Sequence, residues 1–406
     1  VSKSSEEQDI VVVVSAFGKT TNALIKGATL AAQKNEDYLE VLKELENNHF
    51  NIIKELLPVK EQSSVNGYVK QLFNHLETIY EGCFLLRELS PKTLAKVSSF
   101  GELLSSYIIS QAANESFKAV YKDTRELIVA SDNYNNALVD FSATFKNCQE
   151  YFSSRSQKVT IVPGFVARTI NGKTTTLGRG GSDFTAAIIS AALDCSELQI
   201  WTDVSGMFTA NPSIVKQASV IDHISYHEAM ELSHFGAKVI YPPTIQPVLQ
   251  KEIPIVIKNT FKPADQGTLI TKETSKNKPV KGISYIENIT LVTLEGNGMV
   301  GIPGFSKRLF EALYLHHINI ILITQASSEL SICIAISDDD AVTASKIIDE
   351  VFEYEIQLQK VKPVKVEQDL CIIALVGDNM RNHHGLSGKM FSALGKNNIN
   401  IRAIAQ

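Results

Sequence analysis

The chain has 406 residues, of which 44% are hydrophobic, and it carries a formal net charge of −5 with an isoelectric point near 6.0. This length supports two or three domains, and the mild acidity excludes the basic surface typical of proteins that bind nucleic acid or anionic membranes. The apolar runs are strand-sized, far short of the roughly 20 residues of a membrane helix. Five scattered cysteines without CxxC spacing fit neither a disulfide framework nor a zinc site, so we expect a reducing cytoplasm.

The first predicted strand covers residues 10–14 (IVVVV), and long helical stretches follow at 23–57 and 65–89. The segment AFGKT after this strand contains Gly-Lys-Thr, as a P-loop does. A P-loop also needs a glycine five residues before Gly18, where this chain has Val13. The segment is therefore not a Walker A loop. Considered alone, Ser15 and Thr21 are ordinary turn residues, and Glu102 in FGELLSS is a solvated acid at a helix start.

From residue 159 to about 270, short β-branched runs alternate with helical ones. This alternation indicates an α/β layer with a largely parallel sheet. Thr202 and Asp203 end the strand in LQIWTD, at the carboxyl edge where α/β proteins bind ligands. The following segment 272–281 (KETSKNKPVK) is charged and without periodicity, so it is predicted to be a linker.

Within this layer, the stretch LGRGGSDFTAAIIS carries the strongest chemical signal. Its glycines let the backbone approach an anion, and Arg179 offers a guanidinium fork that matches a carboxylate or a phosphate. Ser182 and Asp183 are predicted to cap a helix over 184–193, so the loop feeds a helix N-terminus that attracts anions. The alternative is an ordinary left-handed turn before a helix. The loop lacks the G-x-G-x-x-G spacing of a dinucleotide fingerprint, so nicotinamide chemistry has no visible site.

Beyond the linker the chain repeats itself at a fixed offset of 81 residues, which indicates a duplicated module. Each copy runs strand, glycine loop, helix and second strand (INIILITQ or INIRAIAQ), as a βαββαβ unit begins. The first copy continues to a β-like EIQLQ near residue 356. The matched pairs include Gly296 with Gly377, Met299 with Met380, Gly304 with Gly385, Phe310 with Phe391, and Gln325 with Gln406.

Five motifs in order, FGELLSS, KTTTLGRGGSDFTA, WTDVSGMFTANP, EAMELSHFGAKV and the repeat, resemble the aspartate kinase family. The kinase and regulatory portion of the bifunctional aspartokinase–homoserine dehydrogenases is most similar. The resemblance implies an amino-acid kinase fold, with a mainly parallel eight-stranded sheet between helical layers, followed by tandem ACT modules. The expected domains are the kinase domain at 1–271, the linker at 272–281, and ACT modules at 282–362 and, incomplete, at 363–406.

The implied reaction is the phosphorylation of L-aspartate by ATP, with Mg²⁺ as the counter-charge of the phosphates and no protein cage for the metal. The substrate carboxylate is already ionised at pH 7, so the site needs positioning and charge neutralisation rather than a general base. By resemblance, Arg179 binds the α-carboxylate, Glu102 binds the α-ammonium, and the Ser15 and Thr21 hydroxyls add hydrogen bonds.

On the nucleotide side, Lys238 is expected to stabilise the phosphoryl oxygens and Asp183 to hold cationic groups, so these two and Arg179 are the expected catalytic residues. Phe208 stands where the family often has tyrosine, and Asn211 where aspartate is frequent, which implies remade polar contacts in that loop. The expected nucleotide-binding residues are Gly180, Gly181, Ser182, Thr202, Asp203, Phe208, Asn211 and Lys238.

Two departures from the family pattern limit the expected activity. No strand with KFGGTS precedes Val1, so the chain as given is expected to retain little phosphoryl transfer. No dehydrogenase segment follows the repeat, so no reductase activity is expected.

Gln325 and Gln406 are expected to bind an amino-acid effector at an interface between ACT sheets, because an amide both donates and accepts hydrogen bonds. The ITQASSELSI context resembles the threonine-sensitive branch, and the pairing of ACT sheets implies at least a dimer. Two alternatives remain open. One is another amino-acid kinase, acting on glutamate or acetylglutamate, although those lack tandem ACT modules. The other is a degenerate, non-catalytic amino-acid sensor.

Overall fold

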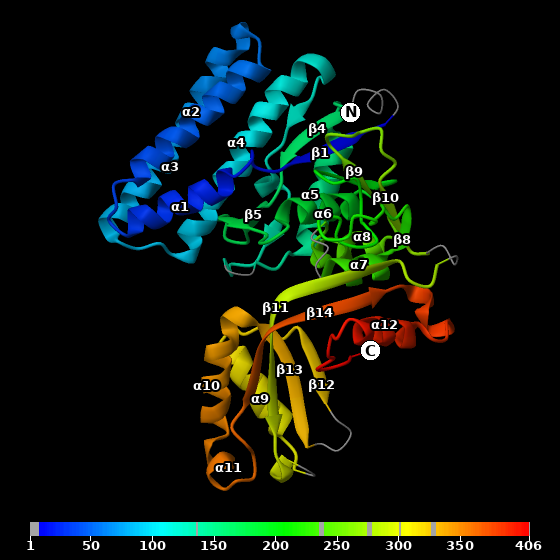
Figure 1. The fold of residues 1–406 in the computed structure, drawn as a ribbon. Coiled ribbons are helices and arrows are strands. Elements are labelled where there is room, and N and C mark those ends of the chain that lie inside the picture. The colour runs from blue at the N-terminus through cyan, green and yellow to red at the C-terminus, as the bar shows by residue number, and fades with distance from the viewer. Residues whose placement is uncertain are drawn as a thin grey trace. The chain divides into compact units, whose positions relative to one another are not determined.

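The computed structural model describes residues 8–134, 137–234, 239–273, 278–299, 302–325 and 330–405, which form two compact units (Figure 1). The first unit holds the described residues up to Met207, the segment Asp222–Tyr226, and the residues from 239 to Glu273. The second unit holds Phe208–Ile221, residues 227–234 and the described residues from 278 onward. Two segments that precede residue 240 therefore fold with the C-terminal part of the chain.

The first unit is built on parallel strands. β1 (Ile10–Val14) pairs in parallel with β4 (Val159–Pro163), which pairs in parallel with β2 (Val120–Tyr121). A second sheet has the order β7-β9-β10-β8, in which only the β9·β10 pair is antiparallel, and a third has the order β3-β5-β6. The mainly parallel layer is confirmed, although in the part of the chain that the structure describes these strands form separate hydrogen-bonded groups rather than one eight-stranded sheet. The other strands are β3 (Val129–Ala130), β5 (Val166–Thr169), β6 (Thr174–Thr176), β7 (Leu198–Thr202), β8 (His223–Ser225), β9 (Ile255–Asn259) and β10 (Thr268–Thr271).

Both faces of β1 are covered by helices. Val12 and Val14 pack with residues of α4 (Pro91–Phe117), whereas Val11 and Val13 pack with residues of α5 (Phe141–Ser154) and α6 (Gly181–Ala192). Because successive side chains of a strand point to opposite faces, a strand buried on both faces is apolar at every position. This explains the uninterrupted IVVVV.

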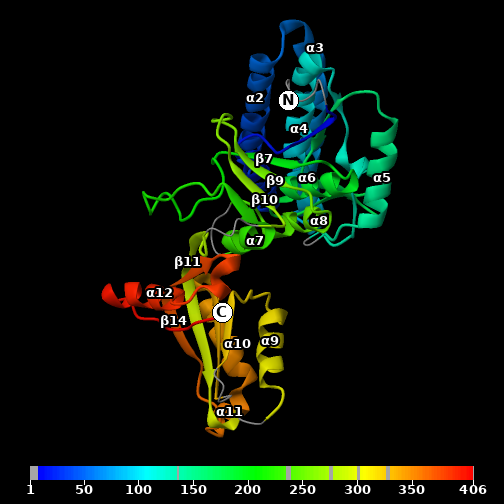
Figure 2. The same ribbon diagram turned by 90° about the vertical axis from the view of Figure 1, so that its right-hand side faces the viewer.

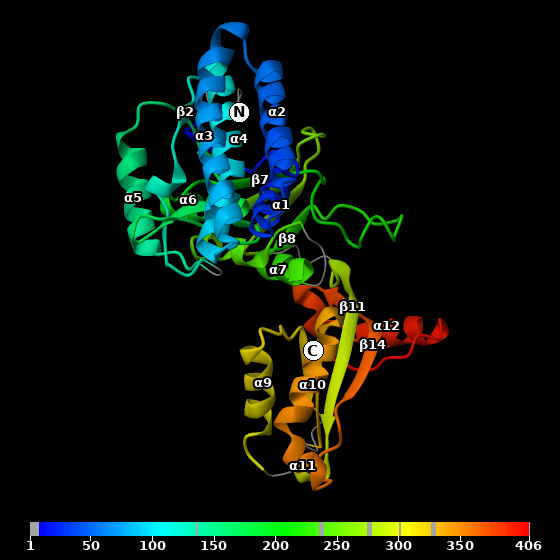
Figure 3. The same cartoon turned by 90° about the vertical axis from the view of Figure 1, so that its left-hand side faces the viewer.

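Helices α1 to α4 form a bundle in which α1 packs against the other three (Figure 3). The predicted helix over 23–57 is wrong, because it is two helices. Lys34 adopts a left-handed φ of 62°, and Asn35 Oδ1 accepts a hydrogen bond from Asp37 N at 2.9 Å, which closes a turn between them. The predicted stretch 65–89 is one helix that begins earlier, after Pro58. The bounds are α1 (Thr20–Ala32), α2 (Tyr38–Leu56) and α3 (Val59–Leu86).

The second unit contains an antiparallel sheet with the order β12-β13-β11-β14. Helices α9 and α10 lie on one side of β11 and α12 on the other (Figure 2). Val292 and Leu294 of β11 face a core with residues of α9 and α10, as expected of an ACT module. The bounds are β11 (Gly282–Glu295), α9 (Phe305–Leu315), β12 (Leu322–Gln325), β13 (Ser331–Ser337), α10 (Ala341–Val351), β14 (Lys365–Val376) and α12 (Leu386–Lys396).

Two details of the predicted repeat are wrong. The segment EIQLQ (355–359) is not β-like, because its first three residues end helix α11 (Glu353–Gln357) and the last two follow in a turn. Arg308 forms an ion pair with Glu355, and the buried Phe352, just before α11, stacks on Phe305. The second strand of the second copy is absent from the described residues 401–405. Its counterpart β12 is a strand because it is hydrogen-bonded to β13, and residues 401–405 have no such described partner.

Short elements complete the described chain. Among the described residues, no helix is both long enough and apolar enough to cross a membrane. The remaining elements are α7 (Tyr226–His234), α8 (Gln246–Gln250), and the 3₁₀ helices η1 (Thr124–Glu126), η2 (Pro242–Thr244), η3 (Asn297–Met299), η4 (Asp338–Asp340) and η5 (Asp378–Asn382).

Candidate functional site

The glycine loop after β6 leads directly into helix α6. Gly178 and Gly180 have φ angles of +75° and +69°, and a Cβ on Gly180 would lie 2.7 Å from the Cβ of Tyr241. Gly180 is the N-cap, and the helix begins at Gly181. The predicted capping by Ser182 and Asp183 is therefore wrong, because the left-handed Gly180 lets the helix start earlier and places both side chains in its first turn.

The start of α6 is fixed by hydrogen bonds to the neighbouring backbone. Thr185 Oγ1 accepts from Phe165 N at 3.0 Å and donates to Gly181 O at 2.8 Å. The N-terminus of this 12-residue helix is therefore held in place, and it can present backbone N–H groups and the positive end of the helix dipole to an anion. Arg179 is exposed on the loop, so its guanidinium is available to a ligand.

Asp183, in the first turn of α6, is partly withdrawn from solvent. Burial raises the pKa of its carboxyl to about 6. A pKa above the ordinary value means that Asp183 gains a proton more readily than a free aspartate as the pH falls, and that it is mostly ionised above pH 7. A nearby cation would lower this pKa, which fits a carboxylate that holds cationic groups.

Glu102 lies on α4 beside the turn that follows β1. Its side chain is 5% exposed, and no hydrogen-bond donor among the described residues reaches its Oε2 atom. Helix α4 can approach this turn closely because the residue before Glu102 is Gly101. A Cβ on Gly101 would lie 2.9 Å from the Ala16 Cβ and 3.3 Å from Thr21 Oγ1. Ser105 Oγ also donates to the Ser15 carbonyl at 2.8 Å. The structure thus brings together three of the four predicted substrate residues.

Burial raises the pKa of Glu102 to about 7, and hydrogen bonds to the backbone at Glu102 and Ala16 offset part of this effect. The solvated acid expected for an isolated glutamate is therefore wrong for Glu102. A buried carboxylate is costly unless it is paired, and a cation beside it would lower its pKa again. The site is chemically suited to an ammonium group.

The predicted nucleotide residues of the first unit lie at the end of β7. Thr202 ends that strand and donates from Oγ1 to Asp203 Oδ1 at 3.2 Å. Sequence reasoning missed the polar network next to them. Asn259, 5% exposed at the end of β9, donates from Nδ2 to Ser205 Oγ at 2.9 Å, and Ser205 Oγ donates to Asp265 at 2.5 Å. A polar residue that ends an apolar parallel strand (IPIVIKN) was the available signal.

Two other predicted nucleotide residues belong to the second unit. Phe208 is half-buried and forms a β-bridge with Val220. Asn211 accepts hydrogen bonds from Ser213 N and Oγ at 2.9 and 2.8 Å, and its Nδ2 donates to Tyr285 Oη at 3.2 Å. Both ends of the Asn211 amide are therefore engaged by protein groups. Lys238 and Gln406 lie outside the described residues.

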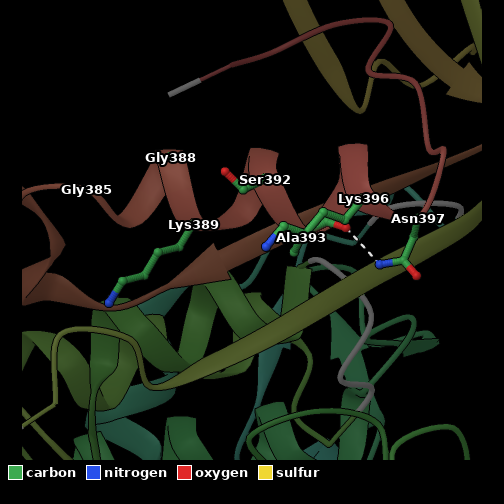
Figure 4. Close-up of a pocket in the computed structure, with 7 residues that line it drawn as sticks. All are labelled: Gly385, Gly388, Lys389, Ser392, Ala393, Lys396 and Asn397. Atoms are coloured by element: carbon green, nitrogen blue, oxygen red, sulfur yellow. Dashed lines mark hydrogen bonds between the residues drawn. The ribbon is translucent and has the colours of Figure 1, made fainter.

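Gln325 is exposed at the end of β12, opposite Ile332 of β13. A separate open hollow of about 660 Å³ lies along α12 (Figure 4). Its lining comprises Gly385, Gly388, Lys389, Ser392, Ala393, Lys396 and Asn397, none of which is a predicted catalytic residue. Among the described residues, no group of three or more histidine, cysteine, aspartate or glutamate side chains is placed to hold a metal ion.

The mainly parallel layers of the first unit and the antiparallel sheet of the second are those expected of an amino-acid kinase domain followed by ACT modules. A model of the amino acid kinase family matches residues 1–259, and a model of the ACT domain matches residues 292–352 and 373–406. The resemblance to this family and the presence of ACT repeats are confirmed.

Similar proteins from plants indicate which kind of amino acid kinase the chain resembles. The chain is 34% identical over its full length to the chloroplastic bifunctional aspartokinase/homoserine dehydrogenase 1 of Arabidopsis thaliana, of which it covers 45%. It is 31% identical, over 98% of its length, to the chloroplastic aspartokinase 1 of the same plant, of which it covers 70%. The chain thus spans about half the length of the bifunctional relatives and most of the length of a monofunctional one.

Solved structures of an aspartokinase are also similar to this chain. The chain is similar to E. coli aspartokinase III in complex with aspartate and ADP, with a TM-score of 0.82 and 29% identity over 98% of this chain and 86% of that one. The complex of the same protein with lysine and aspartate has a TM-score of 0.76, at the same identity and coverage. The chain belongs to the aspartokinase family.

Proposed function

We propose that the full-length protein to which this chain belongs catalyses the ATP-dependent phosphorylation of the side-chain carboxylate of L-aspartate to 4-phospho-L-aspartate. The observation that best supports this proposal is the buried Glu102 carboxylate, with Oε2 unpaired among the described residues, beside the Ser15–Thr21 turn. The α-ammonium of an amino acid would neutralise it. The E. coli relative was solved with aspartate and ADP.

In this proposal the substrate is held at its two charged α-groups. Glu102 binds the ammonium and Arg179 forks onto the α-carboxylate, while the Ser15 and Thr21 hydroxyls donate hydrogen bonds. The side-chain carboxylate is then left free to attack the γ-phosphorus of ATP, and the bond from that phosphorus to the β,γ-bridging oxygen breaks to release ADP. The reaction needs no proton transfer, because the nucleophile is already ionised.

The nucleotide is proposed to lie between the α6 N-terminus and the end of β7. Gly180, Gly181 and Ser182 are proposed to line the phosphate site, where the backbone N–H groups of Gly180 and Ser182 would face phosphate while Gly181 N donates to Gly178 O at 3.1 Å. Lys238 would stabilise the transferring phosphoryl group. Thr202 and Asp203 complete the proposed nucleotide contacts in the first unit, and Asp183 holds cationic groups. Phe208 and Asn211 of the second unit stay sequence predictions, because both ends of the Asn211 amide already bond to Ser213 and Tyr285. Mg²⁺, where it binds, would neutralise the phosphates and take its ligands mainly from them and from water.

One alternative substrate, acetylglutamate, is disfavoured by the same carboxylate. Acetylglutamate has no ammonium, so its binding would leave Glu102 buried without a cation. A non-catalytic sensor remains the alternative outside the enzymes. An ATP/aspartate hydroxamate assay on the full-length protein distinguishes it, since a sensor would show no turnover.

Replacing Arg179 by lysine tests the proposed substrate site. Lysine keeps the charge but cannot form the bidentate contact, so the KM for aspartate should rise about tenfold or more, while the KM for ATP changes less than about twofold. Arg87→Lys, the same change at an exposed residue that follows α3, is the control. Equal KM values for aspartate in the wild type and Arg179→Lys would overturn the role of Arg179.

We further propose feedback regulation by an amino acid, with threonine as the effector, at an interface between ACT modules of at least a dimer. Gln325 is proposed to contact the effector, with Gln406 as its counterpart in the second copy. Titration of kinase activity should show inhibition by threonine that weakens roughly 5- to 150-fold in Gln325→Ala, and no change in Gln357→Ala, an exposed glutamine of α11. Inhibition by lysine alone would contradict the effector assignment.

A further inference from the structure

Two segments within the residues matched by the amino acid kinase model belong to the second compact unit. They are the loop Phe208–Ile221 and the described part of α7 from His227. The loop is fixed to β11, because Ile283 N donates to Thr209 O at 2.8 Å and Asn211 Nδ2 donates to Tyr285 Oη at 3.2 Å. A Cβ on Gly282 would lie 3.0 Å from the Leu232 side chain of α7.

A buried carboxylate joins α7 to the second ACT copy. Glu228 is 1% exposed, and its Oε1 atom accepts a hydrogen bond from Asp378 N at 2.9 Å. Next to it, His227 Nδ1 lies 3.1 Å from Asp378 Oδ1. Asp378 is the first residue of η5, directly after β14 and Gly377, where the glycine loop of the second copy begins. Glu228 therefore binds the backbone at the entrance of that loop.

The two copies are built alike around this point. β11 and β14 pair in an antiparallel manner. Lys281 N donates to Val376 O at 2.8 Å, and Lys362 N donates to Glu295 O at 2.9 Å. These two hydrogen bonds are equivalent, because Lys281 corresponds to Lys362 and Glu295 to Val376 at the 81-residue offset. A Cβ on Gly377 would overlap the carbonyl oxygen of Pro279, and a Cβ on Gly296 would overlap that of Lys360, again at the same offset.

The position of Asp378 corresponds to Asn297 in the first copy. In the second copy, the chain itself supplies a carboxylate to the backbone N–H at this position. An amino-acid effector also carries a carboxylate, which backbone N–H groups of such a loop can bind. In the second copy, Glu228 therefore occupies the backbone N–H at the entrance of the glycine loop. Asn297 holds the equivalent position in the first copy, which also contains the proposed effector residue Gln325.

We propose that Glu228 is a positioning residue that couples the second ACT copy to α7, and that the effector signal is transmitted to α7 through this contact. α7 follows β8 directly in the chain, so a movement of α7 acts on a strand of the first unit through the continuous backbone. The proposed coupling rests on the proposed function, that is, on an aspartate kinase regulated by an amino acid. The hydrogen bond from Asp378 N to Glu228 is independent of that function.

The test compares full-length wild type with Glu228→Ala, Glu228→Gln and the control Glu231→Gln, a half-buried glutamate on the same helix. Amide hydrogen exchange is followed at Asp378 and across α7, with and without L-threonine. Kinase activity is measured in parallel with L-threonine and with L-lysine. Glu228→Gln keeps a hydrogen-bond acceptor, so it remains informative if Glu228→Ala does not fold.

In Glu228→Ala, exchange at Asp378 should be about tenfold faster or more, because a hydrogen bond to a charged group is lost. Basal kcat should stay within about twofold of wild type, while the activity that remains at saturating threonine rises about fivefold or more. Glu228→Gln should be intermediate, and Glu231→Gln should behave as wild type. A purely structural role would instead lower basal activity and leave the fractional inhibition unchanged.

Unchanged exchange at Asp378 in Glu228→Ala would show that the hydrogen bond does not form in solution, and this overturns the proposal. Faster exchange with undiminished inhibition overturns the coupling. An inactive wild type would refute the proposed catalysis alone, since the exchange measurement needs no turnover. In that case the coupling survives only if threonine or lysine slows exchange in α7 of the wild type and not in Glu228→Ala.

Discussion

Glutamine at position 102 is expected to raise the KM for aspartate by roughly 10- to 150-fold, which corresponds to the 1.5 to 3 kcal/mol of a hydrogen bond to a charged group. The side chain keeps its size, so the fold and the neighbouring Ser15–Thr21 turn should be preserved. The KM for ATP should change less than about twofold. Steady-state kinetics with each substrate varied in turn measures both values.

The pH dependence separates this role from a loss of folding. The pKa of Glu102 is raised to about 7 in the free protein, so the carboxyl is mostly protonated at pH 6 and mostly ionised at pH 8. Only the ionised form pairs with an ammonium, so the affinity for aspartate should rise with pH across this range. At pH 7 binding should release about half a proton, which calorimetry in buffers of different ionisation enthalpy detects.

Glu102→Gln should abolish this proton release and flatten the pH dependence of aspartate binding, apart from the contribution of Asp183, whose pKa of about 6 lies lower. Glu115→Gln, near the other end of α4 and exposed, is the matched control and should behave as wild type. Proton release that persists in Glu102→Gln would assign it to another group and remove the support for an ammonium site.

The burial of Glu102 shows where sequence reasoning reaches its limit. Its identity as a substrate residue came from a family resemblance, whereas its isolated sequence context predicted a solvated acid. Burial depends on how closely α4 approaches the turn after β1, and Gly101 permits that approach across about eighty residues of intervening chain. No local pattern encodes such a contact. The glycine loop was predictable, because its residues are contiguous and glycine there reflects backbone dihedral angles.

The repeat was equally visible, because an offset of 81 with no gap is a property of the sequence itself. The pairing of β11 with β14 was not predicted, because it joins strands of different copies. The error at EIQLQ has a similar origin. That short segment alternates polar and apolar residues as a strand does, but the ion pair of Arg308 with Glu355 and the stacking of Phe352 on Phe305 favour a helical turn. Tertiary packing overrode the local pattern.

Alanine at position 180 should both destabilise the first unit and impair phosphoryl transfer, and alanine at position 178 separates the two causes. Both glycines have positive φ angles, so each substitution should cost about 1 kcal/mol for the left-handed backbone. Only the Gly180 Cβ meets a neighbour, at 2.7 Å from the Tyr241 Cβ, whereas the Gly178 Cβ has nothing within 4 Å. Overpacking should add about 1 to 3 kcal/mol at Gly180.

Urea unfolding followed by the fluorescence of Trp201, the single tryptophan, reports on the first unit because that residue lies in β7. We expect Gly180→Ala to lose about 2 to 4 kcal/mol and Gly178→Ala about 1 kcal/mol. Since the overlap with Tyr241 displaces the N-terminus of α6, kcat should fall at least about tenfold more in Gly180→Ala than in Gly178→Ala. Equal losses in the two variants would show that the loop depends on its backbone angles alone and that the contact with Tyr241 does not position the proposed phosphate site.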